Sequence, residues 1–212
     1  MCHCSSRGGL QMNNRKQNIL RGLVLASGLL SVSFSAQAAS SMVVTIETTQ
    51  PIGHYELCQR LPSECRVLRA NAGAVKLNQA SWSRMIDVNA AINSMIKPVT
   101  DQEMWGKEEV WSYPSNKGDC EDFVLLKRKL LMKAGFAENN LLITVVRQSD
   151  GSGHAVLTVT TDRGDFVLDN LRGDVRLWNE TGYVFLKRQS STNSGKWVGI
   201  DDSGNASVAA LK

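Results

Sequence analysis

Residues 118–123 read Gly-Asp-Cys-Glu-Asp-Phe, and they open a segment whose pattern predicts an α-helix over residues 119–134. Apolar side chains recur along this segment at helical spacing, and Gly135 follows it as a stop signal. Cys120 therefore lies in the first turn of the predicted helix. The backbone N–H groups of a first turn and the positive end of the helix dipole favour a thiolate, so Cys120 is a candidate nucleophile.

Two other short pieces of sequence carry side chains that suit a thiol nucleophile. Residues 151–154 read Gly-Ser-Gly-His, a flexible turn that places His154 at the start of a predicted strand. Residues 166–170 read Phe-Val-Leu-Asp-Asn, a predicted strand that ends in Asp169 and Asn170. Acyl transfer through a thioester requires a cysteine nucleophile, a histidine base and an Asp or Asn that orients the histidine. Each residue alone is more often structural, but their joint occurrence favours catalysis.

The remaining pattern predicts one domain of the α+β class. Helical spacing predicts a helix over residues 81–97, ended by Pro98, and Asn89 and Asn93 on its apolar stripe would need buried hydrogen-bond partners. An extended lead-in and four strands are predicted at residues 43–49, 141–147, 154–161, 166–169 and 183–189. The 212 residues, 42% hydrophobic and 21% charged, suffice for one such domain with a buried core.

The register of the two strands that carry His154 and Asp169 decides whether these side chains meet. A two-residue turn at residues 163–164 would place them far apart, whereas direct opposition needs a turn centred on residues 161–162 or a bulge. In the first register, a residue other than Asp169 would have to orient His154.

We interpret residues 1–38 as a secretory signal peptide. Basic residues precede an apolar run over residues 23–34, and residues 36–38 read Ala-Gln-Ala, which fits the cleavage rule. Cleavage after Ala38 would leave a mature chain that begins at Ala39 and is periplasmic or secreted. A membrane anchor is disfavoured, because the run is shorter than the roughly 20 residues that a span needs.

Charge excludes nucleic acid as a partner. The chain has 24 Lys and Arg against 20 Asp and Glu, and four of the basic residues, Arg7, Arg15, Lys16 and Arg21, precede Ala39, where no acidic residue lies. The mature chain therefore has 20 basic and 20 acidic residues, a net charge of zero. That balance leaves no electrostatic footprint for nucleic acid or for an anionic membrane surface.

Three cysteines remain in the mature chain, and export to an oxidising compartment favours disulfides. Cys58 and Cys65 bracket a short polar segment with a proline turn, which makes a bridge between them the natural pairing. Cys120 is then left over. It is an inert buried residue, a crosslinker or a nucleophile, and the number of cysteines alone does not distinguish these three roles. His54 is the competing base, and we interpret it as structural because it lies in an irregular segment before the disulfide loop.

The motif at residues 118–123, the histidine at the start of a strand, and Leu-Asp-Asn at residues 168–170 follow one another as they do in a known family. From about residue 82 to residue 197, the sequence resembles the bacterial transglutaminase-like cysteine proteinases, which include the LapG-type periplasmic proteases. The resemblance implies a papain-like, transglutaminase-like α+β fold, in which the helix that bears the nucleophile packs on an antiparallel sheet.

The same resemblance implies the site. It assigns catalysis to Cys120, His154 and Asp169. In LapG-type members, acidic residues beside the nucleophile bind calcium, and the corresponding residues in this sequence are Asp119 and Glu121.

The acidic residues around Cys120 have a second interpretation. Asp119, Glu121 and Asp122 place three carboxylates within one turn of the thiol, where their charge would raise the thiol pKa and oppose its activation. A bound hard cation would cancel that effect and fix the turn. Alternatively, Asp119 caps the helix and the other acids complement the helix dipole. The sequence leaves both interpretations open.

We therefore expect a signal peptide over residues 1–38, a cysteine proteinase domain over residues 39–200 and a flexible tail over residues 201–212, with Met1 or Met12 as the initiator. The expected function is peptide hydrolysis through a Cys-His-Asp triad. The resemblance implies a protein substrate such as a cell-surface adhesin, and an inhibitory membrane protein as a partner; after cleavage the chain itself would not span a membrane. Acyl transfer to an amine with the same triad, or a binding module with a vestigial thiol site, are the alternatives.

Overall fold

The computed structural model describes residues 41–68 and 73–202. The predicted signal peptide and all but the first two residues of the predicted tail lie outside these ranges. The strands in the described residues are β1 (Val43–Thr48), β2 (Lys97–Pro98), β3 (Lys117–Gly118), β4 (Leu141–Arg147), β5 (Gly153–Thr161), β6 (Gly164–Leu168), β7 (Arg176–Leu177), β8 (Val184–Gln189) and β9 (Trp197–Asp201). The α-helices there are α1 (Ile52–Arg60), α2 (Gln79–Met95), α3 (Asp101–Trp105) and α4 (Cys120–Lys133).

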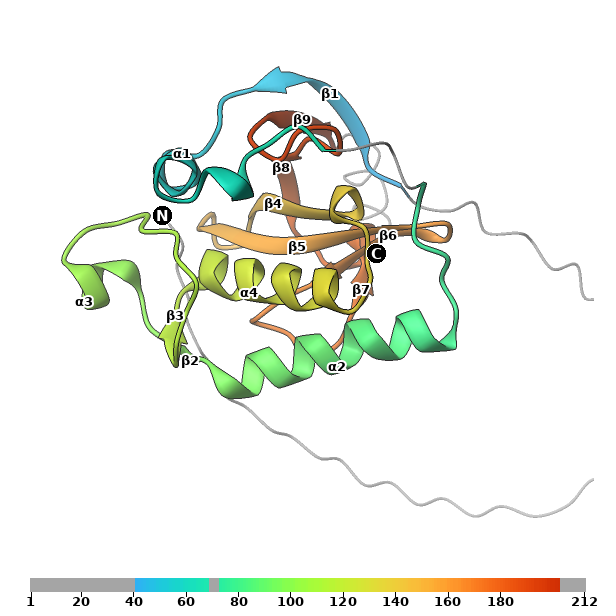
Figure 1. The fold of residues 1–212 in the computed structure, drawn as a ribbon, viewed down its shortest axis with the longest axis horizontal. Helices are drawn as coiled ribbons and strands as arrows, with labels where there is room; N and C mark the ends of the chain where they lie inside the picture. Colours follow the sequence, from blue (N-terminus) through green and yellow to red (C-terminus); the bar gives the residue numbers. More distant parts are fainter. Residues whose placement is uncertain (1–40, 69–72, 203–212) are drawn as a thin grey trace, which may run out of the picture.

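Seven strands form one sheet in the order β1-β9-β8-β4-β5-β6-β7, and each neighbouring pair is antiparallel. Helix α4 lies along one face of this sheet against β5, and α2 lies outside α4 (Figure 1). The short strands β2 and β3 form a separate parallel pair next to α3. The expected α+β class, with the Cys120 helix packed on an antiparallel sheet, is confirmed.

The sheet buries apolar side chains on both faces. The larger cluster joins α4, α2 and the sheet, with Phe123, Ile92 and Leu157 among its fully buried members. A smaller cluster on other positions of the same strands includes Val156 and Val167. Burying a large apolar side chain contributes roughly 1.5–3 kcal/mol, so the layered packing stabilises the helix that carries Cys120.

Helix α2 confirms the predicted helix, two residues earlier in the chain. It begins earlier because Asn78 and Ser81 form a capping box, in which each side chain accepts a hydrogen bond from the other residue's backbone N–H. It ends at Met95 because Ile96 is extended and Lys97 pairs with β3. Pro98 then lies in a strand rather than at the helix end.

The register of β5 and β6 differs from both expected registers. Thr161 pairs with Gly164, so that residues 162–163 form the turn, and Gly164 has a φ of +112° that favours glycine. Extended beyond the paired residues, this register would place residue 171 opposite His154. Because successive side chains alternate between faces, His154 and Asp169 still share one face as diagonal neighbours.

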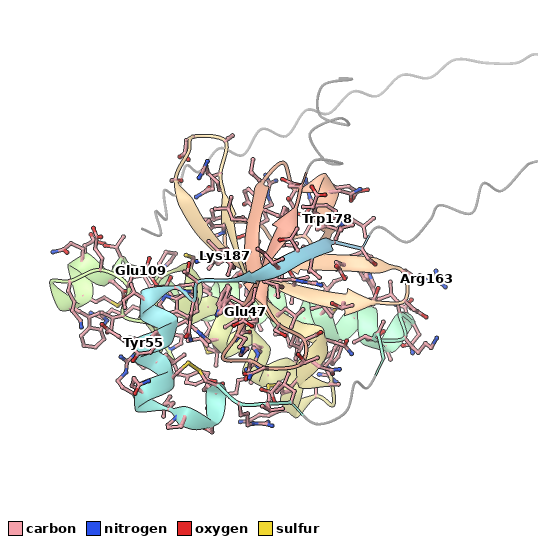
Figure 2. The ribbon with its side chains drawn as sticks, turned by 90° about the horizontal axis from the view of Figure 1, so that it is seen from above. Glu47, Tyr55, Glu109, Arg163, Trp178 and Lys187 are labelled. Atoms are coloured by element: carbon pink, nitrogen blue, oxygen red, sulfur yellow. A yellow bond between two sulfur atoms is a disulfide. The ribbon has the colours of Figure 1, made fainter. Side chains whose placement is uncertain are left out.

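Several elements were not predicted, among them the two-residue strands β2, β3 and β7. The segment around His54, expected to be irregular, is helix α1, and both the short helix α3 and the strand β9 are additional. Strand β1 forms an edge of the sheet, pairing only with β9 among the described strands, and all six of its residues are exposed. Figure 2 shows β1 running across the top of the molecule at Glu47, whose carboxylate pairs with Lys196.

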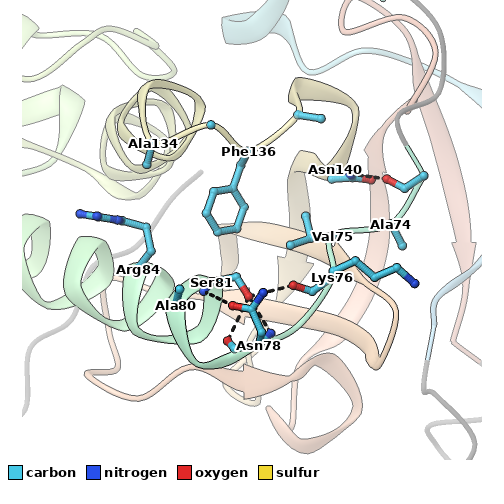
Figure 3. A pocket seen from close by; sticks show the side chains of 13 residues that line it. Ala74, Val75, Lys76, Asn78, Ala80, Ser81, Arg84, Ala134, Phe136 and Asn140 are labelled. Carbon is cyan, nitrogen blue, oxygen red and sulfur yellow. Dashed lines mark hydrogen bonds between the residues drawn. The ribbon is translucent and has the colours of Figure 1, made fainter.

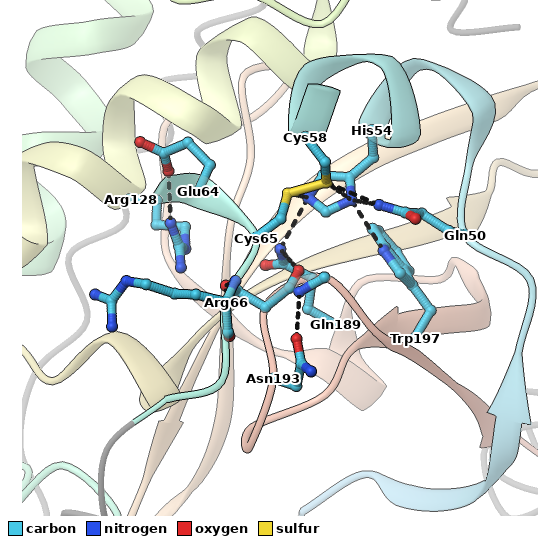
Figure 4. Close-up of a disulfide and its surroundings, with 12 residues drawn as sticks. Gln50, His54, Cys58, Glu64, Cys65, Arg66, Arg128, Gln189, Asn193 and Trp197 are labelled. Atoms are coloured by element: carbon cyan, nitrogen blue, oxygen red, sulfur yellow. Dashed lines mark hydrogen bonds and ion pairs between the residues drawn. A yellow bond between two sulfur atoms is a disulfide. The ribbon is translucent and has the colours of Figure 1, made fainter. Parts of the chain in front are cut away.

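The predicted disulfide between Cys58 and Cys65 is present, with the two Cα atoms 5.4 Å apart. His54 packs beside it and is almost fully buried (Figure 4). The His54 Nδ1 atom contacts Gln50 at 2.6 Å and accepts a hydrogen bond from the Trp197 indole at 3.2 Å. Burial, helped by the charge of Arg128, lowers the pKa of His54 to about 4. The interpretation of His54 as structural agrees with these contacts.

The expectation that Cys120 is left over is not confirmed. Its sulfur takes part in a disulfide, and neither Cys58 nor Cys65 is its partner, because these two bond to each other. The chain has two further cysteines, Cys2 and Cys4, ahead of the predicted cleavage site. Cleavage after Ala38 would remove both of them.

No helix within the described ranges is long and apolar enough to cross a membrane.

A cavity of about 530 Å³ lies between the start of α2 and the end of α4 (Figure 3), with Arg84, Phe136 and Asn140 among its lining residues. It is at the opposite end of α4 from Cys120, so it does not belong to the candidate site.

Candidate active site

Cys120 is the first residue of α4, and the preceding turn is held tightly. A Cβ atom on Gly118 would lie 2.7–2.8 Å from the Asp122 side chain, which explains glycine at this position. The Asp122 carboxylate accepts a hydrogen bond of 2.7 Å from the backbone N–H of Ser112. Asp122 therefore fixes the loop ahead of the helix, and it is not one of the carboxylates that gather beside the thiol.

Cys120 is fully buried, and its sulfur contacts polar groups on both α4 and β5. It contacts Glu121 Oε2 at 3.3 Å and accepts a hydrogen bond of 3.3 Å from the backbone N–H of Ala155. Ala155 directly follows His154 on β5. The fold thus brings the predicted nucleophile to the backbone of the strand that carries the predicted base.

His154 and Asp169 form a buried hydrogen-bonded pair. The distance from His154 Nε2 to Asp169 Oδ1 is 2.8 Å, and each residue is only 1% exposed. The other ring nitrogen, His154 Nδ1, makes no hydrogen bond within the described residues. Of the three residues predicted as a triad, His154 and Asp169 are paired directly. The sulfur of the third, Cys120, accepts its hydrogen bond from the backbone of the residue that follows His154.

Asp169 is held by further hydrogen bonds. The Tyr183 hydroxyl donates to Oδ2 at 2.6 Å, and the backbone N–H of Leu171 donates to Oδ1 at 2.9 Å. Burial acts to raise the pKa of Asp169, but the bond and charge of His154 and the other donors outweigh it, so the pKa lies below its usual value. The carboxylate is therefore ionised at neutral pH and able to orient the imidazole.

Side chains of α2 and α4 hold the segment that follows Asp169. We call these three residues the clamp: Asn89, Asn93 and Lys127. Asn93 donates to the carbonyl of Asp169 at 2.8 Å and to that of Arg172 at 3.0 Å. Asn89 also donates to the Arg172 carbonyl, at 3.1 Å, and its own Oδ1 accepts from Lys127 Nζ at 2.7 Å. These are the buried partners that the two asparagines require. Lys127 is fully buried, and burial lowers its pKa to about 7 although the charge of Asp169 acts to raise it.

Three carboxylates form an acidic cluster beside the thiol. One oxygen each of Asp101, Asp119 and Glu121 lies within 4.8 Å of the others, and all three side chains are buried. Each has one carboxylate oxygen with no hydrogen bond to any described residue. Buried oxygens that converge without donors are ligands suited to a hard divalent cation such as Ca²⁺.

The capping interpretation of Asp119 is wrong for its side chain. Asp119 occupies the N-cap position of α4, but its side chain makes no capping hydrogen bond. It turns instead toward the backbone of Asp101 and the side chain of Glu121. Burial, and next the neighbouring acidic groups, raises the pKa of Asp119 to about 6 and that of Glu121 well above its usual value. Such a cluster is unfavourable without a proton or a cation to balance its charge.

The sequence analysis did not place two residues, Asp101 and Tyr183, in the site. Asp101 lies 18 positions before Asp119 and opens α3 behind Thr100, whose side chain caps the helix; nothing local signals that it meets α4. Tyr183 was expected in a strand, but its hydrogen bond to Asp169 depends on sheet topology. Both contacts join segments that are distant in sequence.

The sequence matches a known protein family over most of its length. Residues 44–205 match the family described as bacterial transglutaminase-like cysteine proteinase, BTLCP. The chain belongs to this family. It is therefore a cysteine peptidase, and the match includes the elements that carry Cys120, His154 and Asp169.

Three similar solved structures are forms of LapG from Legionella pneumophila. The calcium-bound form is 22% identical, with a TM-score of 0.48, and covers 58% of this chain and 71% of that one. A second LapG structure is 23% identical, with a TM-score of 0.47 and coverages of 62% and 76%. The EGTA-treated form is 21% identical, with a TM-score of 0.48 and coverages of 60% and 71%. No curated protein gives a match.

Proposed function

We propose that this chain is an exported cysteine peptidase that cleaves a protein substrate with Cys120 as nucleophile, His154 as base and Asp169 as the residue that orients the base. One observation carries the proposal. His154 Nε2 is 2.8 Å from Asp169 Oδ1, and the residue after His154 donates its backbone N–H to the Cys120 sulfur.

The geometry supports the following proton path. In the processed chain, Asp169 accepts a hydrogen bond from the Nε2–H group of His154, which leaves Nδ1 of His154 to take the proton of the Cys120 thiol. The thiolate then forms a bond to the carbonyl carbon, and backbone N–H groups at the start of α4 stabilise the charge that develops on the carbonyl oxygen. His154 returns its proton to the leaving amine as the C–N bond breaks. It then takes a proton from the water that hydrolyses the thioester and regenerates the thiol.

Calcium fits the acidic cluster. Asp101, Asp119 and Glu121 would hold Ca²⁺, and the bound ion would neutralise the negative charge beside Cys120. Ca²⁺ takes six to eight oxygen ligands, so backbone carbonyls or waters would complete the site. One similar structure, LapG of Legionella pneumophila, is calcium-bound; for this chain, the donor set of its own residues supports the proposal.

We also propose that the enzyme acts in the periplasm or outside the cell, after cleavage behind Ala38. The family description implies a protein substrate. A cell-surface adhesin as that substrate and an inhibitory membrane protein as a regulator are proposals that rest on the resemblance of the sequence to LapG-type proteases.

The test is to incubate purified protein with periplasmic and outer-membrane extracts and to sequence the new N-termini that form. Wild type should generate new termini, and Cys120→Ala should generate none. Ser115→Ala is a suitable control, since this exposed residue lies on the loop before the helix and is outside the triad. Equal termini from wild type and Cys120→Ala would contradict the proposal. Isopeptide bonds in place of new termini would indicate acyl transfer instead, and neither product would indicate a binding module.

A further inference from the structure

A second cavity, of about 510 Å³, lies beside the His154–Asp169 pair. Its walls come from residues 148–149 in the turn between β4 and β5, residues 171–172 after Asp169, and residues 181–183 before β8. A cavity of this size accommodates one or two side chains of a peptide.

The cavity shares two walls with the candidate active site. Leu171 lines it and donates its backbone N–H to Asp169 Oδ1, and Tyr183 lines it and donates its hydroxyl to Asp169 Oδ2. The Tyr183 and His154 rings are in edge contact, with centroids 5.7 Å apart. A peptide that reaches His154 therefore has this cavity next to it.

Charge complementarity indicates what the cavity takes. Arg172 is the one charged residue among the described residues that line it. Of the acidic side chains nearby, Asp169 is paired with His154, Asp150 accepts hydrogen bonds from Ser152, and Asp174 pairs with Arg176. A cationic group in a partly enclosed cavity with no acidic lining favours an anionic ligand.

Arg172 is also held in place. Asn89 and Asn93 both donate to its carbonyl, so that its backbone is fixed from the side of α2. Its guanidinium carbon lies 5.9 Å from the centroid of the Tyr183 ring, and Nη2 is 3.5 Å from the Thr181 carbonyl, a long hydrogen bond. Nε is buried and has no hydrogen-bond partner within the described ranges. A guanidinium has five N–H donors and matches a carboxylate in a two-pronged geometry, so donors remain for a ligand.

We propose that this cavity is a substrate subsite for an acidic residue, and that Arg172 binds the carboxylate of an Asp or Glu side chain on the cleaved protein. The inference rests on the proposed function and adds a substrate class to it. Arg172 determines specificity here and takes no part in bond cleavage.

The first test uses binding, so that it does not depend on turnover. An array of short peptides that differ in pairs, Glu against Gln and Asp against Asn, is incubated with the Cys120→Ala protein. We expect the acidic member to bind at least about tenfold more tightly at one position of the peptide. Adding Arg172→Met should bring that ratio close to one. The matched control is Arg163→Met, because Arg163 is exposed at the far tip of the β5–β6 hairpin (Figure 2).

The second test uses wild-type cleavage of a peptide library. Acidic residues should be enriched at a fixed distance from the cleaved bond, and Arg172→Glu should shift that position toward Lys or Arg. Equal binding of both members of every peptide pair, or a preference that survives Arg172→Met, would overturn the subsite. An array preference without any cleavage by the wild type would instead count against peptide hydrolysis and leave the subsite standing.

Discussion

Hydrogen bonds hold both the carboxylate and the backbone of Asp169. His154 and the Leu171 N–H share one carboxylate oxygen, and the Tyr183 hydroxyl occupies the other. Asn93 holds the backbone carbonyl of the same residue. With backbone and carboxylate both fixed, the imidazole of His154 has one preferred orientation, which is the condition for efficient proton transfer.

Variants of the triad should follow this arrangement. His154→Ala should lower kcat almost as far as Cys120→Ala, by roughly a thousandfold or more, because nucleophile and base act as one unit whose losses do not add. Asp169→Asn should be milder, since its amide oxygen can still accept from His154 while its NH₂ group faces the Tyr183 oxygen. Steady-state kinetics on one peptide measures all three. Substantial activity in His154→Ala would return His54 to consideration as the base.

His54 makes the stability of the protein depend on pH. Its pKa of about 4 in the folded state lies below the ordinary histidine value of 6.5, so the unfolded chain binds more protons between these two pH values. The resulting contribution is complete above pH 6.5 and is lost as the pH falls toward 4. The shift corresponds to about 3 kcal/mol in the free energy of unfolding.

We therefore expect His54→Gln to flatten the loss of stability between pH 6.5 and pH 4. Urea unfolding of both proteins at several pH values within this window measures the difference. Tyr55→Phe is the control, because this neighbouring side chain on α1 is half exposed. Parallel pH profiles for wild type and His54→Gln would show that the buried histidine does not govern acid sensitivity.

At the level of the elements, α2 and α4 meet at the clamp and hold the segment that follows β6. Asn93→Ala should lower kcat by about 10- to 100-fold, since a small displacement of a catalytic group has effects of this size. Lys127→Met should also lower kcat while leaving thermal stability equal or higher, because replacing a buried charge with an apolar group is often neutral or stabilising.

Asn140→Ala is the matched control for the clamp. Asn140 is also buried and donates to a backbone carbonyl, that of Gly73, but at the far end of α4. It should lower the melting temperature and leave kcat unchanged. Equal losses of kcat in Asn93→Ala and Asn140→Ala would show that the clamp supports folding only. In an Asp169→Asn background, the effect of Lys127→Met on kcat should shrink, because interacting residues are not additive.

The acidic cluster joins the short helix α3 to the start of α4. A chelator should abolish activity, Ca²⁺ should restore it, and Mg²⁺ should restore much less, since Mg²⁺ demands near-ideal octahedral geometry and retains its waters. Ca²⁺ at 100 times its dissociation constant should add about 2.7 kcal/mol to the free energy of unfolding. Trp105 on α3 offers a fluorescence signal that is independent of activity.

Asp101→Asn tests the cluster further. With one acid removed, the chelator-treated protein should be more stable than wild type under the same conditions, and the gain from Ca²⁺ should disappear. Asp87→Asn, an exposed site on α2, should change neither. A calorimetric titration without heat of Ca²⁺ binding, together with activity that is indifferent to chelator, would exclude a calcium role.

The elements could be predicted where the pattern was local. The helix at Cys120, the helix over α2 and the strands β4, β5 and β8 follow from spacing and from glycine and proline signals. Helix α1 was missed because Ile52, Gly53 and His54 give little amphipathic pattern, and β9 because its five residues alternate weakly. The register of β5 with β6 depended on which residues of one turn take a positive φ, and Asp101 reaches the site only through the tertiary fold.

At the scale of the whole molecule, processing should change the thiol content. Mass spectrometry of the exported protein should find Ala39 at the N-terminus. Unfolded in urea without reductant, the processed chain should show the Cys58–Cys65 bridge and one iodoacetamide-reactive thiol, on Cys120. A chain that retains residues 1–38 serves as the control. Cys120 bridged to Cys58 or Cys65 in the processed chain would contradict both the pairing and the nucleophile assignment.

The position of β1 sets the order in which the sheet can be completed. Val43 pairs with Asp201, so the first strand of the described chain finds its partner in the last. Long-range pairing of this kind slows folding, because the chain between the two strands loses conformational entropy before the strands gain any stabilising contact. While the chain is still emerging, its first strand has no partner and its exposed valines and isoleucine stay available to other chains. The edge of the sheet formed by β1 therefore cannot close until the ribosome has made the residues up to Asp201, and until then the nascent chain depends on protection from aggregation.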